Sequence, residues 1–256
     1  MSETAALLSV REVSKHFGGV AAVNGVSFEV NNGAIMALIG PNGAGKTTLF
    51  NLISGFSPVT SGAVIWDGRD ITRLSAARRV RLGVTRTFQH ARVFGELSVR
   101  DNIRAACHSV VDKGSFLGDM LGTGRSRAND GVISARADEI LESFGFAAIA
   151  ARQAGELPYG TTKRLGLLIG AATAPKMLML DEPAAGLNHE EVDVLRGDLM
   201  RMRSAGLTVL IVEHHMGLVM DISDSVVVLD AGKKIAEGAP LDIAANPLVV
   251  DAYLGA

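Results

Sequence analysis

One eight-residue stretch near residue 40 constrains the fold of this chain more than any other. Residues 40–47 read Gly-Pro-Asn-Gly-Ala-Gly-Lys-Thr and fit the pattern G-x-x-x-x-G-K-[ST] of a phosphate-binding loop. A short apolar run of strand length, residues 35–39, precedes the loop, and residues 47–54 predict a helix after it. A strand, a glycine loop and a helix in this order are the context that the motif requires.

The residue types of this loop suit a bound triphosphate. Glycines let successive backbone N–H groups turn toward an anion, and the start of the following helix adds its positive dipole end. Lys46 would place a positive charge on the outer phosphates, and the hydroxyl of Thr47 suits a Mg²⁺ ligand. The alternative, an ordinary glycine turn with a surface lysine, is disfavoured by the flanking strand and helix.

Composition limits the possible classes of protein. The 256 residues permit one large domain or two small ones, and 48% hydrophobic residues are enough for a sizeable core. A formal net charge of −2 gives no reason to expect a nucleic-acid partner. The single cysteine, Cys107, excludes a disulfide within the chain and fits a reducing compartment. We expect no signal peptide, and the apolar runs are too short to span a bilayer, so work at a membrane would need a partner.

The alternation of strand and helix patterns predicts an α/β fold whose sheet is parallel at its centre. Repeated glycines interrupt the pattern between residues 108 and 132, where we expect a mobile connection. The expected strands are residues 7–13, 26–30, 63–68, 84–88, 177–180 and 208–212, with a hairpin of 226–229 and 233–237. The expected helices after the loop helix are residues 73–81, 98–107, 134–144, 163–172, 190–202 and 216–222.

A second apolar strand ends in two carboxylates, Asp181 and Glu182. In a phosphate-binding enzyme such a strand ends beside the glycine loop, at the carboxyl edge of the sheet. There Asp181 would hold Mg²⁺ through water, and Glu182 would polarise the water that attacks the γ-phosphate. The alternative is a solvated acidic strand end, which the presence of the glycine loop disfavours.

A third strand ends in Glu213, His214 and His215. A histidine at such an edge can hydrogen-bond a γ-phosphate and report its presence. From the residues alone, a surface histidine without such a role is the better interpretation, and for His215 it remains so.

Taken together, these motifs resemble the nucleotide-binding subunit of an ATP-binding cassette (ABC) transporter, over nearly the whole chain and in the family's order. Residues 40–47 match Walker A, 180–183 the end of Walker B, 157–161 the signature position and 185–188 the D-loop. His214 matches the switch histidine.

The resemblance implies a set of site residues. The implied catalytic residues are Glu182 and His214. The implied metal ligands are Thr47, Gln89 of the Q-loop and Asp181. The implied nucleotide contacts are Phe17, whose ring would lie against adenine, and Gly40, Pro41, Asn42, Gly43, Ala44, Gly45, Lys46, Thr47, Thr48, Gln89 and Gly160.

The resemblance also implies the fold and its parts. We expect the P-loop NTPase fold of ABC ATPases, with a RecA-like core sheet, an antiparallel β subdomain and an α-helical signature subdomain, in a single domain over residues 1–256. The nucleotide-binding core with its β subdomain would comprise about 1–90 and 160–240. The helical subdomain with its glycine-rich insertion would comprise 91–165, and the C-terminal tail 241–256.

A narrower resemblance is to the ATPases of branched-chain (hydrophobic) amino-acid uptake. It is carried by residues 17–20, 87–89 and 181–188, the long segment between 89 and 157, and the ending Ala-Tyr-Leu-Gly at 252–255. It implies ATP and Mg²⁺ as cofactors and permease subunits as partners. It also implies a second ABC ATPase subunit in a hetero- or homodimer, and indirectly an extracytoplasmic solute-binding protein. The expected location is peripheral, at the cytoplasmic face of the inner (plasma) membrane.

The chain departs from the family pattern at the signature. The usual Leu-Ser-Gly-Gly-Gln reads Leu-Pro-Tyr-Gly-Thr at residues 157–161, so Pro158 offers neither a hydroxyl nor an N–H. Gly160 and the following helix start remain able to present N–H groups to an anion. Asn188 replaces the usual D-loop aspartate, and Ile169 lies where the family often has an arginine. We therefore hypothesise that a second, different ATPase subunit supplies the better signature to the ATP of this chain.

Three alternatives to amino-acid import stay open. The same ATPase role could serve urea, amides or the export of a lipid conjugate. A soluble cassette of DNA repair or translation would tend to carry coiled-coil insertions or a fused second cassette, and neither is present. A non-hydrolysing regulatory cassette is disfavoured by Glu182 and His214, although Pro158 and Thr161 leave room for it.

Overall fold

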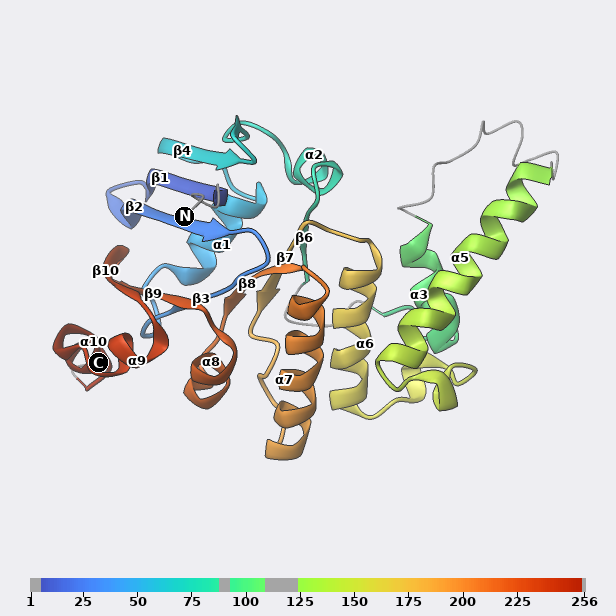
Figure 1. The fold of residues 1–256 in the computed structure, drawn as a ribbon. Helices are drawn as coiled ribbons and strands as arrows, with labels where there is room; N and C mark the ends of the chain where they lie inside the picture. Colours follow the sequence, from blue (N-terminus) through green and yellow to red (C-terminus); the bar gives the residue numbers. More distant parts are fainter. Residues whose placement is uncertain (1–5, 88–92, 109–123, 255–256) are drawn as a thin grey trace, which may run out of the picture. The chain divides into compact units, whose positions relative to one another are not determined.

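The chain divides into two compact units, the first comprising residues 1–89 and 176–256 and the second residues 90–175. The computed structural model describes residues 6–87, 93–108 and 124–254 (Figure 1). Several predictions lie outside these described residues: Phe88 as a strand end, Gln89, residues 109–123 of the glycine-rich connection, and Gly255.

The first unit contains a six-stranded sheet in the order β10-β9-β3-β8-β7-β6. β3 pairs parallel with β8 and β9, β7 pairs parallel with β8 and β6, and only the edge strand β10 is antiparallel. The predicted sheet with a parallel centre is therefore confirmed. The strands are β3 (Ile35–Ile39), β6 (Val84–Arg86), β7 (Met177–Asp181), β8 (Thr208–Val212), β9 (Ser225–Asp230) and β10 (Lys233–Gly238).

Both faces of this sheet are buried. In β3, Met36 and Leu38 belong to one core cluster with Leu49 and Phe50 of the helix α1 (Lys46–Ser54). The alternate residues of β3 are equally buried on the other face, because successive side chains of a strand point to opposite sides. Figure 1 shows α1 between the two sheets of this unit, with α7 (His189–Ser204) and α8 (Met216–Ile222) on the opposite face. A strand that is apolar on both sides therefore leads directly into the glycine loop.

The second sheet of this unit is antiparallel, in the order β2-β1-β4-β5. The hairpin of β1 (Ala6–Phe17) and β2 (Val20–Asn31) is longer than the two short strands that the sequence predicts. Register shifts along β1 allow the pairing to continue through polar residues, and Glu12 adopts a φ of 47° within this stretch. The sheet is completed by β4 (Ser61–Trp66) and β5 (Arg69–Asp70).

A buried arginine fixes the end of α1. Arg79, in α2 (Ala76–Arg81), donates from Nη1 to the carbonyl oxygens of Leu52 (2.8 Å) and Ile53 (2.6 Å). Burial lowers the pKa of this guanidinium to about 10, and its backbone partners make the burial tolerable. Since the helix that follows the glycine loop ends at these carbonyls, Arg79 anchors it. The unit closes with the short helices α9 (Pro240–Ala244) and α10 (Pro247–Leu254).

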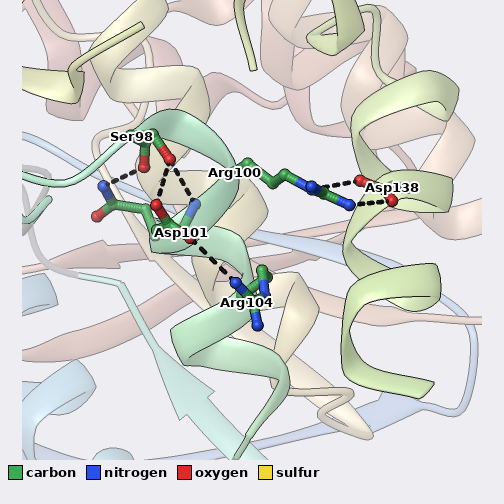
Figure 2. Close-up of polar contacts among 6 residues, drawn as sticks. Ser98, Arg100, Asp101, Arg104 and Asp138 are labelled. Atoms are coloured by element: carbon green, nitrogen blue, oxygen red, sulfur yellow. Dashed lines mark hydrogen bonds and ion pairs between the residues drawn. The ribbon is translucent and has the colours of Figure 1, made fainter. Parts of the chain in front are cut away.

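The second unit is helical, with α3 (Val99–Cys107), α5 (Gly124–Ser143) and α6 (Tyr159–Ala172) and two 3₁₀ turns, η1 (Ala147–Ile149) and η2 (Ala154–Glu156). The helix predicted over 98–107 is confirmed as α3, and Ser98 is its N-cap: Ser98 Oγ accepts from the N–H of Asp101 (Figure 2). Figure 2 also shows the two bonds, 2.7 and 2.5 Å long, that Arg100 of α3 donates to Asp138 of α5. Within residues 6–87, 93–108 and 124–254, no helix has the length and apolar character needed to cross a bilayer.

Two predicted helix starts in this unit were wrong. α5 begins at Gly124 rather than Ser134 and runs through Gly131. A glycine inside a helix costs only about 1 kcal/mol relative to alanine, which packing of the helix outweighs. α6 begins at Tyr159 rather than Lys163, so the signature segment forms its first turn. Pro158 and Gly160 are compatible with this helix start, because backbone N–H groups at the start of a helix have no intrahelical acceptor.

Candidate nucleotide-binding and hydrolysis site

Two positions of the glycine loop exclude any residue with a side chain. Gly40 has a φ of 148°, and a Cβ there would lie 2.1 Å from the carbonyl oxygen of Leu229. Gly45 has a φ of 98°, and its Cβ would lie 2.4 Å from the carbonyl oxygen of Ala22. The loop therefore follows its path against β9 and β2 only with glycine at both positions.

The loop presents unused donors at the start of α1. In the part of the chain that the structure describes, the N–H groups of Gly43, Gly45 and Lys46 have no hydrogen-bond acceptor. The first turn of any helix lacks intrahelical acceptors, and its positive dipole end adds to the same field. These three amides suit an anion.

The lysine of the loop is held against the loop itself. Lys46 is 5% exposed, and its Nζ donates to the carbonyl oxygens of Gly40 (2.7 Å) and Pro41 (2.8 Å). Burial lowers the pKa of Lys46, and the negative charge of Glu182 acts in the opposite direction. A phosphate in the loop would offer this ammonium a charged partner in place of two neutral carbonyls.

The two predicted catalytic side chains lie together. His214 Nε2 is 2.9 Å from Glu182 Oε1, and the two side chains are 41% and 24% exposed, so water can reach both. Glu182 follows β7 directly and has a φ of 49°, a conformation that costs a residue other than glycine of the order of 1–3 kcal/mol. Its N–H donates to the carbonyl oxygen of Val212 (2.9 Å), and its own carbonyl accepts from the N–H of Ala185 (3.2 Å). These bonds hold the strained turn and aim the carboxylate.

Asp181 is paired with an arginine that the sequence interpretation did not include. Arg86 Nη2 donates to Asp181 Oδ2 (2.7 Å), and both side chains are nearly buried. Arg86 Nη1 donates to Asn51 Oδ1 of α1 (2.5 Å), so this guanidinium joins β6, α1 and β7. An available signal was the arginine itself, because a cation inside a buried parallel sheet requires a carboxylate partner.

The oxygen atoms available for a metal fit Mg²⁺. Thr47 is exposed in the first turn of α1, and Asp181 ends β7; hydroxyl and carboxylate oxygens are the ligands that hard cations prefer. The third predicted ligand, Gln89, lies outside the described residues. Across the described residues, no cluster of three or more His, Cys, Asp or Glu side chains could hold a metal.

The remaining predicted contacts lie on the same unit, except Gly160. Phe17, at the end of β1, is 55% exposed, with Lys15 Nζ 5.0 Å from its ring centre, so an aromatic face is available for stacking. Pro41 and Ala44 shape the loop through their carbonyls, which accept from Ala44 N and Gly232 N respectively. Asn42 is exposed, and Thr48 is half-buried in α1.

The signature segment lies in the helical unit. Pro158 is the N-cap of α6 and makes no side-chain cap, while its carbonyl accepts from the N–H of Thr162 (2.9 Å). Gly160 is buried in the first turn. Tyr159 is exposed, with Lys163 Nζ 5.5 Å from its ring centre. The helix start is intact, but it lacks the hydroxyl that a serine would offer.

Asn188 has a structural role. It is the N-cap of α7: its Oδ1 accepts from the N–H of Glu191 (2.9 Å), whose Oε2 accepts from the N–H of Asn188 (3.0 Å). Asparagine and aspartate are comparable N-caps, so this departure from the family pattern keeps the helix start.

Glu213 is a further residue of this site whose role the sequence interpretation missed. It follows β8, is 2% exposed, and accepts backbone N–H bonds from Ala184 and His214. A charged residue directly after a fully apolar strand was the signal for a carboxylate turned inward. The neighbouring His215 accepts from the N–H of Leu218 (3.1 Å) as the N-cap of α8, which gives it a structural role.

Comparisons with known proteins agree with this geometry. A family model described as ABC transporter matches residues 23–185, and one described as branched-chain amino acid ATP-binding cassette transporter matches residues 233–256. The high-affinity branched-chain amino acid transport ATP-binding proteins BraF of Pseudomonas aeruginosa and LivG of Salmonella typhimurium are 42% and 43% identical to the chain. Each similarity covers 97% of this chain and 98% of the relative. A solved ABC transporter cassette in its ADP conformation superimposes with a TM-score of 0.83 at 30% identity, covering 99% of this chain and 100% of that one.

The expected fold of an ABC ATPase is therefore confirmed. The chain belongs to the ABC transporter family, as an ATP-hydrolysing cassette of the branched-chain amino acid transport branch.

Proposed function

We propose that this chain hydrolyses ATP to power the import of branched-chain or other hydrophobic amino acids through partner permeases. The observation that carries the hydrolytic part is the 2.9 Å contact of Glu182 with His214, each of which directly or closely follows a strand of the parallel sheet. The cargo is supported by the names of BraF and LivG, since nothing in the catalytic site would contact an amino acid.

The site residues would have separate roles in hydrolysis. The loop amides and Lys46 would hold the phosphates, and Thr47, Asp181 and Gln89 would hold Mg²⁺. Bound Mg²⁺ would neutralise charge on the β- and γ-phosphates. Glu182 would accept a proton from the attacking water. His214, which contacts the Glu182 carboxylate, would donate a hydrogen bond to the γ-phosphate.

The assembly follows from the family. An ABC transporter cassette works with permease subunits and a second cassette, and ATP bound between two cassettes favours the closed pair by mass action. We propose that the second cassette is a different chain with an unmodified signature. An extracytoplasmic solute-binding protein would deliver the cargo, and this chain would lie peripherally at the cytoplasmic face of the inner membrane. Residues 91–165 would act as the signature subdomain, residues 1–90 and 160–240 as the nucleotide-binding core, and residues 241–256 as the C-terminal tail.

An uptake experiment tests this function. In cells lacking this chain, we expect loss of labelled leucine, isoleucine and valine uptake, restored by the wild-type chain and not by Glu182→Gln at equal expression. Labelled urea and acetamide serve as comparison cargoes. Loss of urea or amide uptake with unchanged leucine uptake would reassign the cargo, and unchanged uptake of all five would contradict import. Restoration by Glu182→Gln would contradict the role of hydrolysis.

A further inference from the structure

Glu213 lies between the two segments that carry the predicted catalytic side chains. β8 ends at Val212, and the next side chain turns inward until it is 2% exposed. A buried carboxylate is strongly unfavourable unless hydrogen bonds satisfy its oxygens. The hydrogen-bond partners of Glu213 therefore indicate the role of its carboxylate.

Among the described residues, this carboxylate accepts hydrogen bonds from three backbone amides. Oε1 accepts from the N–H of Ala184 (2.6 Å), and Oε2 accepts from the N–H groups of His214 (2.9 Å) and His215 (3.1 Å). One oxygen thus holds the segment after β7, and the other holds the segment after β8. A single side chain joins the two backbones.

These bonds bracket Glu182. The N–H of Glu182 donates to the carbonyl oxygen of Val212, and two residues later the N–H of Ala184 donates to Glu213. The turn with its positive φ is therefore attached to the end of β8 on both sides of the Glu182 Cα. Since the backbone sets where a side chain begins, the 2.9 Å contact between Glu182 and His214 depends on this attachment.

We propose that Glu213 is a positioning residue for hydrolysis: its carboxylate holds the backbones of the Glu182 turn and the His214 turn in register. This inference rests on the proposed roles of Glu182 and His214. Glu213 itself acts through the two backbones and does not touch the nucleotide.

The arrangement requires a carboxylate rather than an amide. A glutamine offers one acceptor oxygen and an NH₂ group that only donates. With N–H donors at both oxygen positions, the NH₂ group of Gln would face another N–H whichever way it is flipped. An aspartate keeps the charge but is one methylene shorter, so it reaches one of the two backbones less well.

The central test compares Glu213→Gln with the matched control Asp224→Asn. Asp224 Oδ2 also accepts a backbone N–H, that of Ile35 (2.8 Å), at the opposite end of β3 from the glycine loop. For Glu213→Gln we expect kcat to fall by about tenfold to hundredfold, as for a misplaced catalytic group, while the Kd for a fluorescent ATP analogue stays within about twofold. For Asp224→Asn we expect a lower melting temperature and an unchanged kcat.

A double variant separates positioning from general destabilisation. Added to Glu182→Gln, the Glu213→Gln change should reduce the remaining single-turnover rate by less than about twofold, because the register that Glu213 sets acts by placing the Glu182 carboxylate against His214. A purely structural role would multiply the loss. If Glu213→Gln does not fold, Glu213→Asp replaces it, with an expected kcat below that of the wild type and a Kd for the ATP analogue within about twofold.

The inference is overturned by a normal kcat in Glu213→Gln, by equal losses of kcat and nucleotide affinity, or by a multiplicative loss in the double variant. Full hydrolysis by Glu182→Gln alone would instead contradict the proposed function. The two failures are therefore distinguishable in one set of assays.

Discussion

The glycine-loop edge of the parallel sheet and the first turn of α6 differ in how they present donors to an anion. At the sheet edge, the loop, Lys46 and the Glu182–His214 pair all meet the family pattern. A buried hydrogen bond holds Lys46, and a partly exposed contact joins Glu182 and His214. At α6, a helix start is present, but Pro158 provides no side-chain cap and no hydroxyl. We propose that the chain combines a hydrolytic half at this sheet edge with an altered signature half at α6. In a paired cassette, each half would serve a different ATP.

The largest expected effect is on turnover at the sheet edge. Glu182→Gln should keep ATP binding and lower kcat by about 10²–10⁴-fold, the usual contribution of a positioned general base. Phosphate release measured alongside binding of a fluorescent ATP analogue checks this. Undiminished hydrolysis would show that the edge is not the hydrolytic half.

The Arg86–Asp181 pair tests whether the sheet edge is one tightly packed structure. Arg86→Met leaves Asp181 nearly buried without its cation, so the free energy of unfolding should fall by about 3–5 kcal/mol. Urea unfolding measures this. The double variant Arg86→Met with Asp181→Asn should be more stable than Arg86→Met alone, and equal or lower stability would contradict the buried-pair interpretation.

A substitution at Lys46 tests the role of this lysine in ATP affinity separately from turnover. Lys46→Ala removes charge-assisted bonds to phosphate worth about 1.5–3 kcal/mol, so the Kd for ATP should rise by about tenfold to a hundredfold. Calorimetric titration checks this, with Lys163→Ala in α6 as a matched lysine control. Unchanged ATP binding would remove the phosphate role of the loop lysine.

A substitution at Pro158 tests the altered signature half at α6 directly. Pro158→Ser restores a hydroxyl at the N-cap of α6, and one added hydrogen bond of about 0.5–1.5 kcal/mol should raise hydrolysis by this chain alone by about two- to tenfold. Hydrolysis is measured for the chain alone and mixed with its partner cassette. Full activity of the wild-type chain alone would contradict the heterodimer.

The smallest effect is expected at Asn188. Asn188→Asp keeps the oxygen that accepts from the N–H of Glu191, so the free energy of unfolding should change by less than about 0.5 kcal/mol. Asn188→Ala, which removes the cap, should cost about 1 kcal/mol in the same urea experiment. A large loss in Asn188→Asp would mean that the amide has a partner beyond the capping box.

Much of the fold and site could be predicted because several signals agreed. The glycine loop, the apolar strand before it and the strand ending in Asp181 and Glu182 each had the expected neighbours in sequence. The predictions failed where a local signal was overruled by packing: Gly131 lies inside α5, and the bulged hairpin of β1 and β2 extends through polar residues. Arg86 and Glu213 were missed because a charge in a buried strand region is interpretable only with its partner.

The sequence by itself determined which residues can cradle a phosphate, because backbone freedom at glycine and the order of strand, loop and helix are local properties. It also determined the family, through motifs spread along the chain. Only the tertiary structure decided which groups meet: the 2.9 Å contact of Glu182 with His214, the Arg86–Asp181 pair, and the amides gathered by Glu213. Residues distant in sequence come together only when parallel strands align their carboxyl ends. Because an unpaired charge is strongly destabilising once it is buried, each buried charged side chain there requires a partner.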